Sequence, residues 1–235
     1  MNAYSRKTVA TLCALVVWTQ TPHSGAQSRL DTLPASPDYV RRVEAALLVQ
    51  TLNADLLSHD SASVTLEHWC SVHHLASPAR ITAERVRAAE KPPTDIQRQR
   101  LRVAPMDEVR YRRVRLRCGT VLMSEADNWY VPARLTPQMN QLLDSTDTPF
   151  GIAVQPLHFQ RHTILSEVLW QPLPSGWEMS PPTATDGAGE LCLPGQLLRH
   201  RAMLTLPDGT PFSEVVETYT SDVLAIPRLA PLHPC

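Results

Sequence analysis

The stretch EVRYRRVRLRCG, residues 108–119, decides how the sheet of this protein is built. Side chains of a β-strand point alternately to opposite faces of the sheet. One set becomes increasingly basic along the chain and is predicted to meet solvent: Val109, Tyr111, Arg113, Arg115 and Arg117. The other set ends in three apolar positions and is predicted to face the core: Arg110, Arg112, Val114, Leu116 and Cys118. The alternation therefore predicts that Arg112 points inward.

An inward Arg112 needs a partner, because a guanidinium does not lose its charge and is rarely buried unpaired. We expect an anion to meet it, either an acidic side chain or the carboxylate of a ligand. The alternative is structural: an internal salt bridge, or a side chain that extends to water from the end of the strand. The strand does not distinguish these possibilities.

Length and composition indicate a single globular domain. The chain has 235 residues, 43% of them hydrophobic, and a formal net charge of -1. It is long enough to bury a core of its own. Basic residues gather only in the 108–118 strand and in the RQRLR run at 98–102, which argues against nucleic-acid binding.

The first residues have the order of a secretory signal peptide. Arg6 and Lys7 precede the apolar run Thr8–Trp18, and the small residues Ser24–Ala26 follow. We expect cleavage after Ala26, with residues 27–235 forming the mature domain. The apolar run is too short to span a bilayer, so no stable membrane anchor is expected after cleavage. The expected location is periplasmic or secreted.

Four cysteines would remain after cleavage: Cys70, Cys118, Cys192 and Cys235. In an oxidising compartment they allow three disulfide pairings, and the sequence does not choose among them. Their spacing does not resemble a metal site.

Hydrophobic periodicity and turn residues predict the elements along the chain. We expect helices at 37–57, 64–75 and 136–143, and a crossing loop at 90–105. Strands are expected at 79–88, 108–118, 121–131, 152–157, 162–170, 197–206 and 211–219. Residues 172–194 read as an irregular insertion and those after Ser221 as a tail. The fold class expected is α+β, with a single antiparallel sheet of about six strands and helices packed on one face. Leu47, Val114, Leu116, Leu204 and Leu206 are expected in the core.

The last strand contains an acid among apolar neighbours. In the VVETY run Val215, Glu217 and Tyr219 share one face. If this face is buried, Glu217 needs a cation such as Arg112 to offset the loss of water. If Phe212 and Val216 point inward instead, Glu217 lies in solvent. Alternation leaves both readings open.

No strong catalytic motif is present in the sequence, which lacks GxSxG, a phosphate loop, HExxH and a cysteine–histidine signature. Five short motifs in one order nevertheless resemble the chorismate lyase (chorismate pyruvate-lyase) family and its wider fold superfamily. They are Asp60–Ala62, Arg112–Leu116, Pro149–Gly151, Gln160–Arg161, and Gly209–Pro211 followed by Glu217 and Tyr219. The resemblance spans about residues 37–224, and its weight lies in the order of the pieces.

The resemblance implies a reaction and a set of roles. Arg112 would bind a substrate carboxylate, Glu217 would act as the catalytic group at the ether oxygen, and Phe150 would line the pocket. Ala62 would also contact the substrate, and it stands where the family has a larger residue, which would loosen the pocket. The implied reaction eliminates pyruvate from chorismate to leave 4-hydroxybenzoate and requires no cofactor or metal. Glu217 lies one residue further from Gly209 than in the family, so its facing depends on a β-bulge.

Two other functions fit the same sequence. The first is a non-catalytic exported module that binds a small aromatic or carboxylate ligand with the same fold. The second is a structural or assembly role without a small-molecule site. Export counts against chorismate turnover, because chorismate is made in the cytoplasm.

The signal-peptide reading predicts a mature protein that starts at Gln27. N-terminal sequencing of the protein isolated from its native host should return the sequence QSRLD. Protein recovered from the cytoplasm with residues 1–26 still attached would contradict the prediction.

Overall fold

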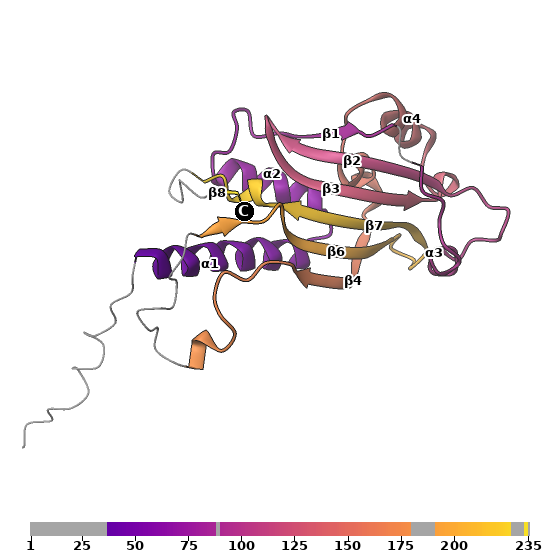
Figure 1. The fold of residues 1–235 in the computed structure, drawn as a ribbon. Coiled ribbons are helices and arrows are strands. Elements are labelled where there is room, and N and C mark those ends of the chain that lie inside the picture. Colours follow the sequence, from indigo (N-terminus) through magenta and orange to yellow (C-terminus); the bar gives the residue numbers. More distant parts are fainter. Residues whose placement is uncertain (1–36, 88–89, 180–190, 227–232, 235) are drawn as a thin grey trace, which may run out of the picture. The chain divides into compact units, whose positions relative to one another are not determined.

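The computed structural model of the chain describes residues 37–87, 90–179, 191–226 and 233–234 (Figure 1). The predicted signal peptide and Cys235 lie outside these residues. No helix within them combines the length and the apolar character that a membrane span requires.

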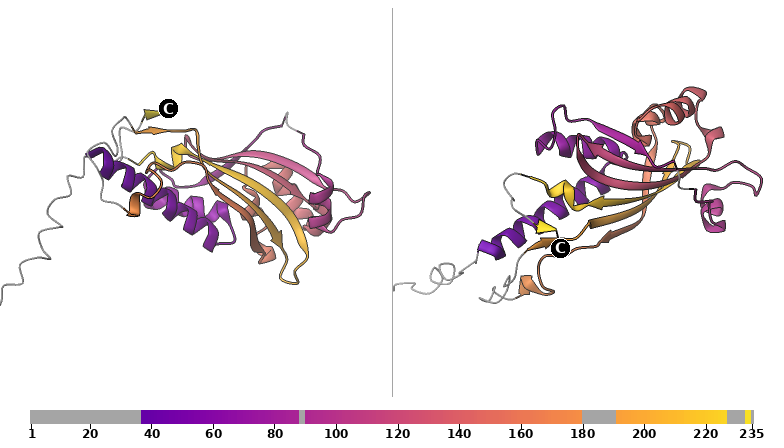
Figure 2. Two further views of the ribbon diagram at one scale, coloured as in Figure 1. Left: turned by 60° about the horizontal axis from the view of Figure 1, so that its bottom comes forward. Right: turned by 45° about the horizontal axis from the view of Figure 1, so that its top comes forward.

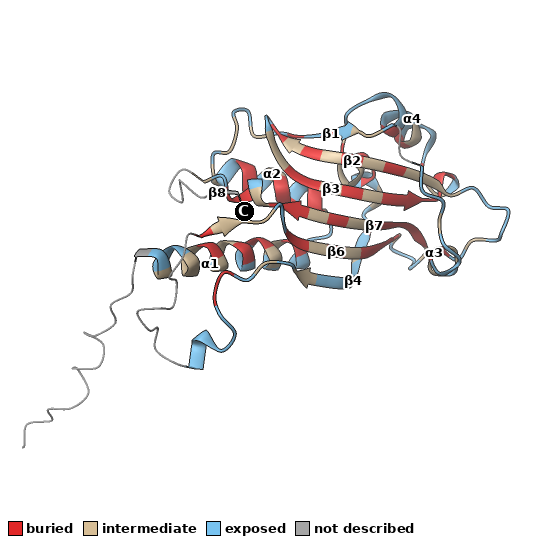
Figure 3. Cartoon of the chain, in the orientation of Figure 1, coloured by how far each residue is buried: buried red, intermediate tan, exposed pale blue. Residues whose placement is uncertain are grey.

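Six strands form one antiparallel sheet in the order β1-β2-β3-β7-β6-β4. Their bounds are β1 Ile81–Arg85, β2 Arg110–Cys118, β3 Val121–Tyr130, β4 Gln160–Val168, β6 Gln196–Thr205 and β7 Pro211–Thr220. The central strands β3 and β7 are largely buried, whereas β4 at one edge is mostly exposed (Figure 3). The α+β class with a single antiparallel sheet is confirmed.

The longer helices lie on one face of this sheet. They are α1 (Pro37–Ser58) and α2 (Ala62–Val72), and the strands arch over both in the left view of Figure 2. The remaining elements are short: α3 Asp95–Leu101, α4 Pro137–Ser145, α5 Phe150–Ala153, η1 Pro132–Arg134, η2 Gln155–Leu157, η3 Trp177–Met179, η4 Ser221–Leu224, and the paired strands β5 Cys192–Leu193 and β8 His233–Pro234. Beyond the predicted arrangement, α3 packs on the opposite face, because its Gln97 hydrogen-bonds Glu214 of β7 there.

One residue of helix α1 that was expected in the core is exposed instead. Ala45, Val49, Leu52 and Leu56 recur at helical spacing and are almost fully buried. Leu47 is 65% exposed, so its assignment to the core was wrong. Two positions along a helix turn the side chain by about 200°, which places residue 47 opposite residue 45.

Two short segments were assigned the wrong structure. The predicted strand 152–157 forms α5 and η2, with Ala153 N–H donating to Pro149 C=O. The predicted loop 90–105 contains α3, which begins with a capping box: Thr94 and Gln97 each cap the other's backbone N–H. The helix buries Leu101 beneath the sheet.

The core lies between the sheet and the helices α1 and α2. Val114, Leu116 and Leu204 are buried as expected, and Leu206 is partly buried. Cys70 of α2 and Cys118 of β2 form a buried disulfide. Chain that was expected to be a tail continues into the core, because Val223 and Leu224 of η4 are buried.

The opposite face of the sheet carries a ladder of ion pairs. Arginines of β2 meet acids of the neighbouring strands, as in the contacts of Arg115 Nε with Glu125 (3.1 Å) and Arg117 Nε with Glu84 (2.8 Å). These side chains are partly exposed, so each pair contributes little to stability. The ladder confirms that the basic set of β2 faces solvent and that Arg112 points the other way.

The buried and exposed leucines give a test of these assignments. Leu116→Ala should lower the free energy of unfolding by ~2–4 kcal/mol, because it removes buried methyl groups and leaves a cavity. Leu47→Ala is the control and should change it by less than ~0.5 kcal/mol, because this side chain is exposed. Urea denaturation measures the free energy of unfolding of both variants. Similar losses would contradict the burial of Leu116 or the exposure of Leu47.

Candidate functional site

A cavity lies between the sheet and the N-terminal end of α2, and we call it the central cavity. Strands β2, β3, β4, β6 and β7 and the starts of helices α2 and α5 contribute to its lining. The lining residues are Asp60, Ser61, Ala62, Ser63, Arg112, Val114, Leu116, Ala126, Asn128, Phe150, Gly151, Phe159, Arg161, Leu204, Val215 and Glu217. The cavity volume is about 40 Å³ in this conformation, little more than a water molecule occupies. A bound ring would therefore displace some lining side chains.

All four site residues predicted from the sequence line this cavity: Ala62, Arg112, Phe150 and Glu217. Arg112 and Glu217, which are far apart in the chain, face the same side of the sheet on β2 and β7. Strand β3 lies between them, pairing Asn128 with Arg112 and Ala126 with Glu217. The two charged groups therefore approach the cavity from different strands.

A β-bulge sets the direction in which Glu217 points. Leu204 pairs with Ser213 and Thr205 pairs with Pro211, so Phe212 is the extra residue of β7. Phe212 and Glu217 are both buried on the helical side as a result, although strict alternation would place them on opposite faces. The predicted dependence of Glu217 on a bulge is confirmed. Because of the bulge, Phe212 points inward as one reading of the sequence had it, and Glu217 points inward as the other had it.

Arg112 is buried without an acidic partner. The residue is 3% exposed, and among the described residues its Nη2 atom donates to the Thr148 carbonyl oxygen at 3.1 Å. Its Nε and Nη1 atoms are buried and have no hydrogen-bond partner. Burial, reinforced by the like charge of Arg85, lowers the pKa of Arg112 to about 10. The group remains charged at neutral pH and retains two unused donor atoms.

Glu217 has a different cation as its partner. Arg161 of β4 donates from Nη2 to Glu217 Oε2 at 2.5 Å, and the Tyr219 hydroxyl donates to the same oxygen at 3.1 Å. Both charged side chains are nearly enclosed, at 4% and 7% exposure. Burial disfavours the charge of Arg161, but the adjacent carboxylate outweighs it and raises the pKa of that guanidinium.

Arg161 is the buried charged lining residue to which the sequence assigned no role. Its motif was recognised, but strand β4 is exposed along most of its length, which gave no reason to place this side chain inside. The contact with Asp60 explains the position of Arg161. The Asp60 carboxylate accepts a hydrogen bond from the Arg161 backbone N–H at 2.8 Å and holds the start of β4 against the loop before α2.

A second polar layer supports Glu217 from behind. The ring of His200 of β6 lies against Tyr219, with centroids 5.3 Å apart, and its Nε2 atom contacts Asn53 Oδ1 of α1 at 2.8 Å. Burial lowers the pKa of His200 to about 4, so this ring is neutral at pH 7. The layer adds no charge to the cavity.

The apolar walls come from two helix starts. Ser61 caps α2 by accepting the Val64 N–H, and Gly151 of α5 approaches it so closely that an added Cβ would lie 2.6 Å from Ser61 Oγ. The ring of Phe150 lies near those of Tyr130 and Phe212. A larger residue at position 151 would therefore force the Ser61 hydroxyl, which caps α2, to move.

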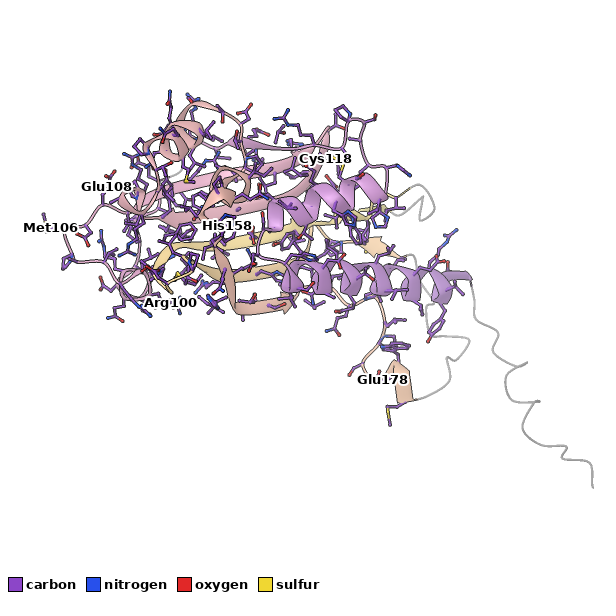
Figure 4. All side chains as sticks on the ribbon, turned by 180° about the vertical axis from the view of Figure 1, so that it is seen from behind. Arg100, Met106, Glu108, Cys118, His158 and Glu178 are labelled. Carbon is purple, nitrogen blue, oxygen red and sulfur yellow. A yellow bond between two sulfur atoms is a disulfide. The ribbon has the colours of Figure 1, made fainter. Side chains whose placement is uncertain are left out.

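A shallow depression adjoins the cavity and shares three lining residues with it: Asp60, Ser61 and Phe159. His59 and His158 lie on its rim. In Figure 4, which looks at the helical face, His158 lies beside the N-terminal end of α2. No cluster of metal-ligating side chains occurs within the described residues.

Comparison with known proteins gives one strong match. The chain is 45% identical over 232 residues to the uncharacterized protein y4mC of Sinorhizobium fredii, covering 98% of this chain and 96% of that protein. No protein-family model matches the chain.

Solved structures show weaker likeness. The effector domain of PhnF from Mycobacterium smegmatis has a TM-score of 0.45 at 11% identity, covering 69% of this chain and 90% of that one. The ligand-binding domain of a putative GntR-family transcriptional regulator from Bordetella bronchiseptica has a TM-score of 0.38 at 13% identity, covering 61% and 84%. The possible transcriptional regulator YydK of Bacillus subtilis has a TM-score of 0.37 at 13% identity, and the match spans 61% of this chain and 59% of that chain.

The buried ion pair of Arg161 and Glu217 gives a prediction with a matched control. Glu217→Gln should lower the free energy of unfolding by ~3–5 kcal/mol, because Arg161 would then be a buried charge without compensation. Glu167→Gln removes the acid of an exposed pair with Arg199 and should cost less than ~1 kcal/mol. Equal effects in urea denaturation would show that the Arg161–Glu217 pair is not enclosed.

Proposed function

The chain belongs to the same family as the Sinorhizobium fredii protein y4mC, and we propose that it binds a small carboxylate-bearing ligand in the central cavity. The observation that carries the proposal is Arg112, whose buried Nε and Nη1 atoms have no hydrogen-bond partner. A buried cation in this state is costly, and a ligand carboxylate would supply the missing acceptors and the opposite charge. The proposed ligand therefore carries its carboxylate next to Arg112.

The charge of the lining supports a ligand with one negative charge. Arg161 and Glu217 neutralise each other, and Asp60, the other acid of the lining, is exposed to water; the buried charge left is that of Arg112. Phe150 and Phe159 supply an apolar wall that suits an aromatic ring. An aromatic monocarboxylate, such as 4-hydroxybenzoate, fits this combination of charge and surface.

Chorismate lyase activity is the second candidate. It is favoured by the convergence of Ala62, Arg112, Phe150 and Glu217 on one cavity, since the resemblance assigns roles to these four residues. Elimination of pyruvate needs hydrogen bonding or protonation of the departing ether oxygen. A carboxylate engaged in an ion pair has no proton to give, so the donor in this site would be the Arg161 guanidinium rather than Glu217.

The proposed place of action is the periplasm or the exterior of the cell. The buried disulfide between Cys70 and Cys118 supports this proposal, since disulfides persist in oxidising compartments and are rare in the cytosol. An exported protein would meet free carboxylic acids rather than newly made chorismate, which again favours binding over turnover.

Calorimetric titration of the purified protein with 4-hydroxybenzoate tests the proposal. Binding is expected, and at 100 times the dissociation constant the ligand should add ~2.7 kcal/mol to the free energy of unfolding. Arg112→Leu should weaken binding by about 30-fold or more, because the carboxylate would lose a buried charged partner. The control is Arg113→Leu, which changes the next arginine on the solvent face and should leave the affinity unchanged.

Incubation with chorismate separates the two candidates. Release of pyruvate and 4-hydroxybenzoate by the unmutated protein, abolished in the Arg112→Leu variant, would establish the lyase instead of the binding module. Equal affinity of the Arg112→Leu and Arg113→Leu variants for 4-hydroxybenzoate would contradict both.

A further inference from the structure

Arg112 is not the only buried lining residue with an unused donor atom. The Nδ2 atom of Asn128 and the Nε atom of Arg161 are also buried without a hydrogen-bond partner. Asn128 is 3% exposed and lies in β3, directly opposite Arg112 in the register of β2 and β3. Side chains at opposite positions of an antiparallel pair have Cβ atoms roughly 4.5–5.5 Å apart, within reach of one small ligand group.

The amide of Asn128 is anchored at one end by Ser213. The hydroxyl of Ser213 in β7 donates to Asn128 Oδ1 at 2.5 Å, and Ser213 is completely buried. Because the amide oxygen is occupied as an acceptor, the NH₂ group at the other end remains as a donor. A buried amide donor without an acceptor is unfavourable, as the unpaired Arg112 is, and both line the same cavity.

We propose that Asn128 Nδ2 and Arg112 together bind the carboxylate of the ligand, with Ser213 as the residue that positions the amide. This inference rests on the proposed function and specifies its carboxylate subsite. A neutral amide adds a hydrogen bond without a second positive charge. The subsite therefore favours a monocarboxylate over a group with two negative charges, such as inorganic phosphate near neutral pH.

Asn128→Asp tests the arrangement without any ligand. The substitution puts a carboxylate oxygen where Nδ2 lies while Ser213 can still donate to the other oxygen. Beside Arg112 this carboxylate forms an internal ion pair that imitates the ligand, and the melting temperature should rise by about 2–4 °C, corresponding to ~1 kcal/mol for a domain of this size. A fall in melting temperature would mean that Nδ2 does not face Arg112 and would overturn the inference.

A double-mutant cycle identifies the source of the change. In an Arg112→Leu background, Asn128→Asp creates a buried carboxylate without a cation and should lower the melting temperature. The same change of melting temperature in both backgrounds would exclude coupling between residues 112 and 128 and would overturn the inference.

Binding provides the second readout, with 4-hydroxybenzoate and inorganic phosphate as probes. Asn128→Ala should weaken 4-hydroxybenzoate binding by about 10-fold or more, and Asn128→Asp should abolish it, because the internal carboxylate occupies the subsite. The control is Asn140→Ala, since Asn140 donates to the Pro132 carbonyl oxygen away from the cavity. Unchanged affinity in Asn128→Ala, or phosphate bound more tightly than 4-hydroxybenzoate, would contradict the inference.

The two readouts also separate this inference from the proposed function. Unmutated protein that binds neither probe would contradict the proposed function for this ligand class. The melting cycle would then decide by itself whether Asn128 and Arg112 form one anion subsite.

Discussion

The site depends on one physical constraint, which is that the guanidinium of Arg112 is buried and has no acidic partner. The alternation of β2 forces this side chain inward together with Val114 and Leu116, because its neighbours on the other face belong to the ion-pair ladder. The Thr148 carbonyl oxygen satisfies one of its nitrogen atoms. A pKa of about 10 leaves the group charged at neutral pH, so its remaining donors require an anion that the described residues do not supply.

The second constraint is the bulge at Phe212, which couples the apolar core to the polar site. The extra residue lets β7 bury Phe212 against the aromatic cluster around Phe150 and still turn Ser213 and Glu217 toward the cavity. Without it, one of these two functions of the strand would be lost, because a shift of one residue exchanges the faces of a strand. The bulge therefore determines where both the Ser213–Asn128 bond and the Arg161–Glu217 pair form.

Much of the fold could be predicted from the sequence, and the failures have physical causes. In a long strand such as 108–118, the buried and the exposed face can be predicted, because many alternating residues all give the same assignment. Leu47 was misplaced because several apolar residues of α1 recur near helical spacing, and the choice of buried stripe depends on what packs against the helix. The run 152–157 was read as a strand because a short apolar stretch does not distinguish strand from helix. Helix α3 was missed although its capping box, Thr94 and Gln97, is visible in the sequence.

In the candidate site, too, residues placed by their neighbours in the chain were predictable, and residues placed by contacts distant in sequence were not. Arg112 was predictable because its neighbours in the chain are apolar on one face and basic on the other. Arg161 was not, because its burial comes from the loop before α2, which Asp60 fixes to the start of β4. Asn128 was not predictable either, since its unused donor results from Ser213, a residue that the sheet brings beside it.

The two buried arginines have different functions because their surroundings differ. Arg161 shares Oε2 of Glu217 with the Tyr219 hydroxyl, so its charge is compensated inside the protein. Such a pair can orient a ligand or hydrogen-bond a departing oxygen, but it attracts no net anion. Asp144 and Asp147 offset part of the charge of Arg112, but no ion pair with it forms among the described residues, so it still attracts an anion. The cavity thus combines a buried cation with an ion pair that carries no net charge, and this asymmetry would fix the orientation of a ligand that has a carboxylate at one end.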